Sequence, residues 1–113
     1  MTQMIVLGRT WEGRDIMALR ITDNPQVEEA DEPDILIMGA HHASELPSAE
    51  VPMYVLEFLV ENYAVNSSVR GLVNSRDIWF VPLVNPDGRE YALNYDLEWR
   101  KNRRPVDING DGI

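Results

Sequence analysis

The stretch that most constrains this chain runs from Asp34 to Glu45 and reads DILIMGAHHASE. Four consecutive apolar residues, 35–38, have the length of a strand and stand between a proline and a glycine. This pattern predicts a buried strand that ends just before two histidines. His42 and Glu45 then lie three residues apart in a short turn, which brings an imidazole beside a carboxylate. Because zinc binds both groups, the stretch is a candidate for part of a metal site. The alternative is an ordinary strand-end histidine that has found a hydrogen bond, since a single His-x-x-Glu match arises often by chance.

Composition narrows the classes of protein that the chain can belong to. Its 113 residues are enough for one small domain, and the absence of cysteine excludes disulfides, thiolate metal ligands and a cysteine nucleophile. A net charge of −9 argues against a nucleic-acid surface, which needs clustered basic residues. No apolar run approaches the roughly 18 residues of a membrane span, and the N-terminus lacks the pattern of a signal peptide. We therefore expect neither nucleic acid nor membrane as a partner.

The first third of the chain predicts a hairpin and an acidic loop. Met4–Leu7 and Asp15–Ile21 have the pattern of two short strands separated by glycines and polar residues. Residues 23–33 contain two prolines and several acids, which is typical of a solvated surface loop. A calcium site is the alternative for four of these acids, Glu28, Glu29, Asp31 and Glu32.

The middle of the chain predicts two helices. The first extends from Pro47 to about Asn62, with Ser48 as its cap. A second, short helix is expected over residues 66–74. The apolar face predicted for the first helix contains Pro52, Val55, Leu56, Leu59 and Tyr63, and is widened by Met53, Phe58 and Val60.

A second apolar run, DIWFVPLV at residues 77–84, predicts a strand central to the sheet, with irregular hydrogen bonding at Pro82. The NPDG sequence at residues 85–88 predicts a turn whose side chains are structural. Strand, helix and strand, with both strands buried on both faces, predict an α/β layered domain. Ligands bind at the carboxyl ends of strands in open α/β sheets, which favours a functional role for His42.

Two further segments have residues that could bind a ligand. Trp99–Arg103 is basic, and a guanidinium beside a metal could stabilise a developing oxyanion, although spacing alone favours a solvated basic loop. Asp107, Asn109 and Asp111 match the start of a calcium-binding loop, whose last ligand would lie beyond Ile113. A turn rich in glycine and asparagine explains these last residues equally well.

Taken together, four segments resemble the zinc metallocarboxypeptidases of the carboxypeptidase A and carboxypeptidase T type. They are GAHHASE at 39–45, ENY at 61–63, LVNSRDIWFVPLVNPDG at 72–88 and WRKNRRP at 99–105. The resemblance implies an α/β fold with a mixed sheet flanked by helices, the phosphorylase/hydrolase-like fold of zinc peptidases. It implies that residues 1–113 are a truncated catalytic domain whose C-terminal part is missing. The reaction implied is hydrolysis of the C-terminal peptide bond of a peptide or protein, by a secreted enzyme.

The resemblance also implies roles for single residues. His42 and Glu45 match two of the three ligands of one Zn²⁺ ion, and Arg100 matches the catalytic arginine that stabilises the oxyanion. His41 then has a structural or supporting role, and Ser44 stands where family members often have a substrate-contacting arginine. The third ligand (a histidine), the glutamate base, the Asn-Arg pair and a substrate tyrosine are expected after the printed residues. We therefore expect these residues alone to bind zinc weakly and to hydrolyse nothing.

Two other functions remain open on this sequence. One is a non-catalytic relative that binds peptide or metal without turnover. The other is a related zinc amidohydrolase that acts on peptidoglycan peptides or N-acyl amino acids. An unpaired apolar strand edge is also expected, which predicts association of the isolated chain.

Overall fold

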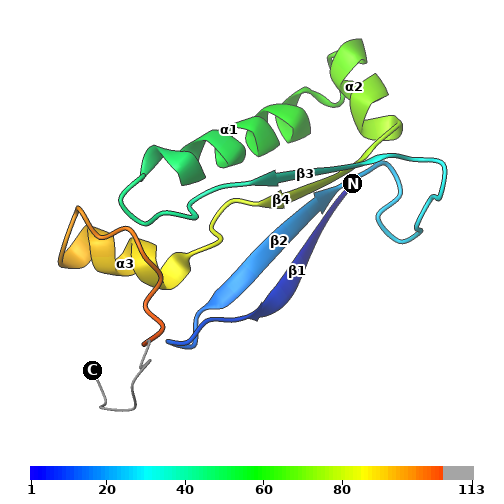
Figure 1. The fold of residues 1–113 in the computed structure, drawn as a ribbon. Helices are drawn as coiled ribbons and strands as arrows, with labels where there is room; N and C mark the ends of the chain where they lie inside the picture. The colour runs from blue at the N-terminus through cyan, green and yellow to red at the C-terminus, as the bar shows by residue number, and fades with distance from the viewer. Residues whose placement is uncertain (106–113) are drawn as a thin grey trace.

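The computed structural model describes residues 1–105 and contains a four-stranded sheet in the order β1-β2-β4-β3 (Figure 1). β1 (Thr2–Arg9) and β2 (Asp15–Ile21) form the predicted antiparallel hairpin. β2 pairs antiparallel with β4 (Asp77–Val81), and β4 pairs parallel with β3 (Asp34–Met38). The sheet is therefore mixed, as the resemblance implies.

Among the described residues three helices accompany the sheet: α1 (Pro47–Asn62), α2 (Ser67–Asn74) and α3 (Pro86–Asn94). α1 and α2 pack on one face, where Leu56, Val73 and Phe80 belong to one buried core cluster. α3 lies at the end of the sheet where the turn between β1 and β2 is found (Figure 1). Within residues 1–105, no helix is both long and apolar enough to cross a bilayer.

The two apolar strands differ in their burial. β4 is the inner strand beside β3 and is covered on both faces, as predicted. The prediction for β3 is wrong on one face, because Leu36 is 59% exposed and Met38 is 47% exposed. Ile35 and Ile37 pack against the core from the other face. The reason is position: among the described residues β3 is an edge strand, and α1 covers only one side of it.

The start of α1 differs from the prediction in its capping. Leu46 is the N-cap and provides no side-chain hydrogen bond, so the expected cap at Ser48 is wrong. The Ser48 hydroxyl instead donates to the carbonyl of Glu45 at 2.6 Å and accepts from the amide of Ala40 at 3.0 Å. Ser48 therefore ties the first turn of α1 to the residues that follow β3.

The buried face of α1 is narrower than predicted. Its buried residues are Ala49, Pro52, Leu56 and Leu59. Phe58 and Val60 are exposed, so the predicted widening of the apolar face is wrong there. A helix packed on a sheet by one side buries only the stripe that faces the sheet.

The chain between β3 and α1 passes close to the helix. A Cβ atom added at Gly39 would collide with the backbone carbonyl of Ser48, so only glycine fits there. Ala40 follows with a φ of 56°, in the left-handed region that L-residues adopt rarely. After this tight path, His41 is exposed and His42 is half-buried.

The segment after β4 is the main difference from the predicted elements. The residues NPDG were predicted to be a turn, but they begin α3. Asn85 is the N-cap, proline occupies the first helical turn and Asp87 is the acid in that turn, which is a standard helix start. The strand before it ends at Val81, next to Pro82, in agreement with the irregularity expected there.

Candidate metal centre

His42 and Glu45 lie next to each other in the turn between β3 and α1. The His42 Nδ1 atom is 3.1 Å from Glu45 Oε2, and both side chains are partly exposed. Two tetrahedral zinc ligands at about 2.0–2.2 Å from the metal lie about 3.3–3.6 Å apart, so a small separation of these two donor atoms would let both bind one ion. The residues present therefore fit a zinc ion as two of its protein ligands.

The backbone of this turn fixes both side chains on one side. The amide of Glu45 donates to the carbonyl of His42 at 3.1 Å, and the amide of Ser48 donates to the carbonyl of Glu45 at 3.0 Å. Ala43, between the two, is buried. The turn thus points its small residue inward and leaves the imidazole and the carboxylate at the surface.

The His41 side chain lies in a different part of the surface from that of His42. Its side chain is exposed and lines an open recess of about 550 Å³, together with Trp11 of the hairpin turn and Arg104. Neither His42 nor Glu45 lines that recess. The side chains of the two adjacent histidines therefore lie in different parts of the surface.

Arg100 approaches the metal-ligand turn through its backbone. The amide of Ala43 donates to the carbonyl of Arg100 at 3.0 Å, which places the loop after α3 directly against the turn. The Arg100 side chain is exposed, and within residues 1–105 no carboxylate pairs with it. The structure thus brings the backbone of Arg100 next to the pair formed by His42 and Glu45.

The sequence predicted a structural role for Asn85 within a turn. In the structure its side chain also bonds to residues that are distant in the sequence. It is only 7% exposed. Its Nδ2 group donates to the carbonyls of His41 and Lys101, each at 3.1 Å, while its Oδ1 accepts from the amide of Gly88 at 3.0 Å. The only sequence signal for this residue is its place before a proline, which marks a helix N-cap.

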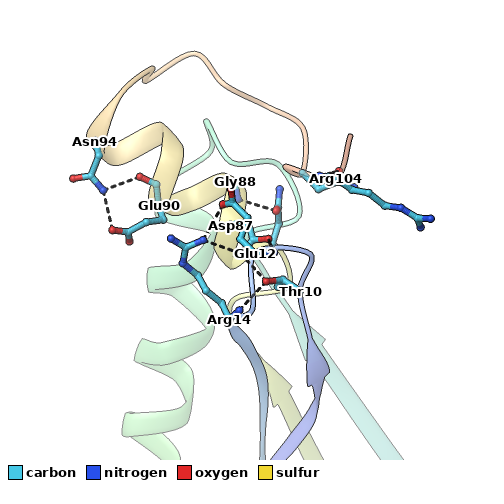
Figure 2. A network of polar contacts seen from close by, with 10 residues as sticks. Thr10, Glu12, Arg14, Asp87, Gly88, Glu90, Asn94 and Arg104 are labelled. Carbon is cyan, nitrogen blue, oxygen red and sulfur yellow. Dashed lines mark hydrogen bonds and ion pairs between the residues drawn. The ribbon is translucent and has the colours of Figure 1, made fainter. Parts of the chain in front are cut away.

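Asp87, two residues further on, attaches the hairpin turn to α3 (Figure 2). Its carboxylate, 3% exposed, accepts from the Thr10 hydroxyl at 2.7 Å, the Glu12 amide at 3.0 Å and the Arg14 guanidinium at 2.9 Å. Burial alone would raise the pKa of Asp87, but the hydrogen bonds from Thr10, Arg14 and Glu12 outweigh burial and lower it. Asp87 therefore remains ionised at neutral pH.

The basic segment after α3 is not uniformly solvated. Lys101 and Arg104 are exposed, in agreement with a solvated loop, but Arg103 is not. The Arg103 guanidinium lies 4.0 Å from the ring centre of Tyr91 and 4.8 Å from that of Trp99. This stacking anchors the loop that contains Arg100 on α3.

A second group of possible metal ligands lies elsewhere in the chain. Asp23, Glu29 and Glu32 gather in the acidic loop with their carboxylate oxygens within 4.8 Å of one another. Burial, followed by the hydrogen bond with Glu29, raises the pKa of Glu32. This loop precedes β3, whereas His42 follows it, so the cluster and the zinc candidate lie at opposite ends of that strand.

Asp107, Asn109 and Asp111, the predicted calcium ligands, lie outside the described residues. The chain contains only the two histidines at 41 and 42, so a third histidine ligand cannot come from the printed sequence.

Comparisons with known proteins find similar sequences along most of this chain. Over residues 1–113 the chain matches the family model described as zinc carboxypeptidase. A zinc carboxypeptidase of Saccharothrix mutabilis subsp. capreolus is 41% identical over 101 residues, which are 88% of this chain and 23% of that protein. An inactive metallocarboxypeptidase of Paracoccidioides brasiliensis is 39% identical over 106 residues, 94% of this chain and 18% of that protein.

Solved structures show the same fold. Carboxypeptidase A from Helicoverpa armigera has a TM-score of 0.83 at 30% identity and covers 96% of this chain with 25% of its own. Thrombin-activatable fibrinolysis inhibitor has a TM-score of 0.85 at 24% identity and covers 97% of this chain with 27% of its own, a likeness of fold. The chain thus spans about a fifth of the length of these two relatives and about a quarter of these two solved chains.

Proposed function

We propose a function for this chain, which belongs to the zinc carboxypeptidase family. The protein that contains these residues hydrolyses the C-terminal peptide bond of peptides, with one zinc ion as its cofactor. The observation that carries the proposal is the 3.1 Å separation of His42 Nδ1 and Glu45 Oε2 at the carboxyl end of β3. The third ligand and the general base belong to parts of the domain outside the printed residues.

Each residue of this site has a specific task. His42 and Glu45 would hold the zinc ion, which would supply a Lewis acid to polarise the substrate carbonyl. Arg100, whose backbone contacts the turn and whose side chain is exposed, donates to the carbonyl oxygen as it gains negative charge. Ser44 is short and uncharged, so this position offers the substrate no cationic partner.

Zinc binding is the first test and needs only the 113-residue chain. We expect equilibrium dialysis to give weak binding of one zinc ion, weakened further at least tenfold by His42→Ala and by Glu45→Gln. His41→Ala is the matched control, since that side chain lines the neighbouring recess. Loss of binding in His41→Ala with retention in His42→Ala would overturn the ligand assignment.

Hydrolysis is tested on a longer protein that includes residues 1–113 and has the length of the curated relatives. With a blocked dipeptide as substrate, Arg100→Ala should lower kcat by about 10²–10³-fold, the usual effect of removing one oxyanion donor. The 113-residue chain alone should show no turnover, because it offers only two zinc ligands. Turnover by the short chain, or an Arg100→Ala variant of the longer protein with normal kcat, would contradict the proposed roles.

A non-catalytic function is the second candidate, because a relative that is 39% identical is described as inactive. Such a protein would keep the fold and bind peptide or metal without turnover. Calorimetry that shows peptide binding by a zinc-loaded longer protein, without cleavage, would favour it. N-acyl amino acids and peptidoglycan peptides in the same assay test the amidohydrolase alternative.

An extracellular location, which the resemblance implies, is also part of the proposal. Detection of the full-length protein in the culture medium of its host would support this location. Exclusive recovery from the cell lysate would contradict it.

A further inference from the structure

Two loops meet at the candidate metal centre, and both are held by the segment that follows β4. The amide of Val84 donates to the carbonyl of Gly39 at 3.0 Å, and the amide of Asn85 donates to the carbonyl of Ala40 at 3.1 Å. These backbone bonds continue the pairing of β3 and β4 past the end of the sheet. They bring the Asn85 side chain beneath the first residues of the metal-ligand turn.

The Asn85 amide group extends this pairing to a third segment. Its Nδ2 donates to His41, the residue before the zinc ligand His42, and to Lys101, the residue after Arg100. Each of these carbonyls is 3.1 Å from the same nitrogen atom, so one side chain joins the two loops. The direct bond from the Ala43 amide to the Arg100 carbonyl lies between the same two loops.

The chemistry of this position requires an amide side chain. The Oδ1 atom must accept from the amide of Gly88 to cap α3, and the Nδ2 atom must donate to two carbonyls at once. Aspartate and serine keep the cap acceptor but cannot make both carbonyl bonds, and aspartate would also place a negative charge against two carbonyl oxygens. Because the residue is buried, the carbonyls left without a partner would not be solvated freely.

We propose that Asn85 is a positioning residue, whose Nδ2 group holds the turn that contains His42 and Glu45 against the loop that contains Arg100. It touches neither metal nor substrate, and it sets the separation between the zinc ligands and the arginine. This inference rests on the proposed function, and it extends that function to a residue outside the ligand set.

A test independent of catalysis follows the Ala43 amide by hydrogen exchange in the 113-residue chain. Asn85→Ser should retain the helix cap but lose the two carbonyl bonds and some stability. The Ala43 amide should therefore exchange at least about tenfold faster than in Asn66→Ser when the two variants are compared at the same free energy of unfolding. Asn66→Ser is the matched control, because Asn66 caps α2 through its side-chain oxygen and contacts neither loop. If Asn85→Ser does not fold, Asn85→Asp keeps a stronger cap acceptor and serves as the second variant.

The kinetic test uses the zinc-loaded longer protein. Asn85→Ser should lower kcat by about 10- to 100-fold with little change in KM, since misplacement of a catalytic group by about 1 Å costs that much. In an Arg100→Ala background the same substitution should lower kcat by less than about threefold, because the group that Asn85 positions is already gone. A residue that only stabilised the fold would lower kcat equally in both backgrounds.

The outcomes separate the two proposals. Absence of hydrolysis in the unmodified longer protein would overturn the proposed function, while the hydrogen-exchange comparison would still decide the role of Asn85. Hydrolysis in the unmodified protein, with Asn85→Ser and Asn66→Ser alike in exchange and in kcat, would overturn the positioning role alone. Equal losses of kcat with and without Arg100 would overturn it as well.

Discussion

The buried carboxylate of Asp87 at the start of α3 forms an ion pair of 2.9 Å with Arg14 in the turn between β1 and β2. These residues are separated by 73 positions in the sequence, so the contact attaches one end of the hairpin to the helix beside the candidate site. The Thr10 hydroxyl binds the same carboxylate. The anchor is a charged one, and its contribution to stability must therefore depend on pH.

We expect stability to fall at acid pH through Asp87. Its pKa is lowered from 3.8 in the folded chain, so its contribution is complete above that value and is lost as pH falls through the lower, folded value. Asp87→Asn should cost about 1–3 kcal/mol at pH 7, because a buried hydrogen-bonded acceptor is weakened. The cost should shrink below pH 3.8 in urea titrations at several pH values.

The control for this prediction is Asp31→Asn, which changes an exposed acid of the loop before β3. This substitution should leave the free energy of unfolding unchanged at each pH. A cost of Asp87→Asn that is the same at pH 7 and at acid pH would show that the charge of Asp87 does not stabilise the fold.

A second ion pair, between Arg20 of β2 and Asp77 of β4, is buried within the sheet. Both residues are at most 9% exposed, and the Arg20 Nε atom is 2.8 Å from Asp77 Oδ1. Asp77→Ala should cost about 3–5 kcal/mol, because it leaves a buried guanidinium without its counter-charge. Replacement of both residues, Arg20→Met with Asp77→Leu, should cost much less, as measured by chemical denaturation. A double variant as unstable as Asp77→Ala would show that packing and not charge is responsible.

The path between β3 and α1 predicts opposite effects for two glycines. Gly39→Ala would bring a methyl group into the Ser48 carbonyl, whereas a Cβ at Gly71 in α2 meets nothing within 4 Å. Gly39→Ala should lower both stability and zinc affinity, because it displaces the turn that contains His42. Gly71→Ala should raise stability by about 0.5–1 kcal/mol through helix propensity and leave zinc affinity unchanged. Thermal melts and dialysis with zinc measure both, and a zinc affinity unaffected by Gly39→Ala would contradict the coupling.

How much of the molecule the sequence predicts depends on the range of the interactions. β2 has the predicted bounds, and His42 and Glu45 meet because they are close in one turn. The links made by Asn85, to residues 44 and 16 positions away, cannot be seen in any local pattern. The stacking of Arg103 on Tyr91 is equally hidden, since it needs α3, which the sequence pattern presented as a turn.

The exposure of one face of β3 could not be predicted from the sequence, because it also depends on contacts with distant parts of the chain. An apolar run indicates that a strand can be buried, but which elements cover it is decided by the rest of the fold. Leu36 and Met38 point away from α1 on a strand that is an edge among the described residues. Exposed apolar edges promote association of chains.

We therefore expect the 113-residue chain to self-associate through this edge. Sedimentation velocity should show a concentration-dependent oligomer, and Leu36→Lys should shift it toward monomer by placing a charge on the edge strand. Val65→Lys, at an exposed apolar residue between α1 and α2, is the control and should leave association unchanged. A monomer at all concentrations, or equal effects of both substitutions, would show that β3 is not the associating surface.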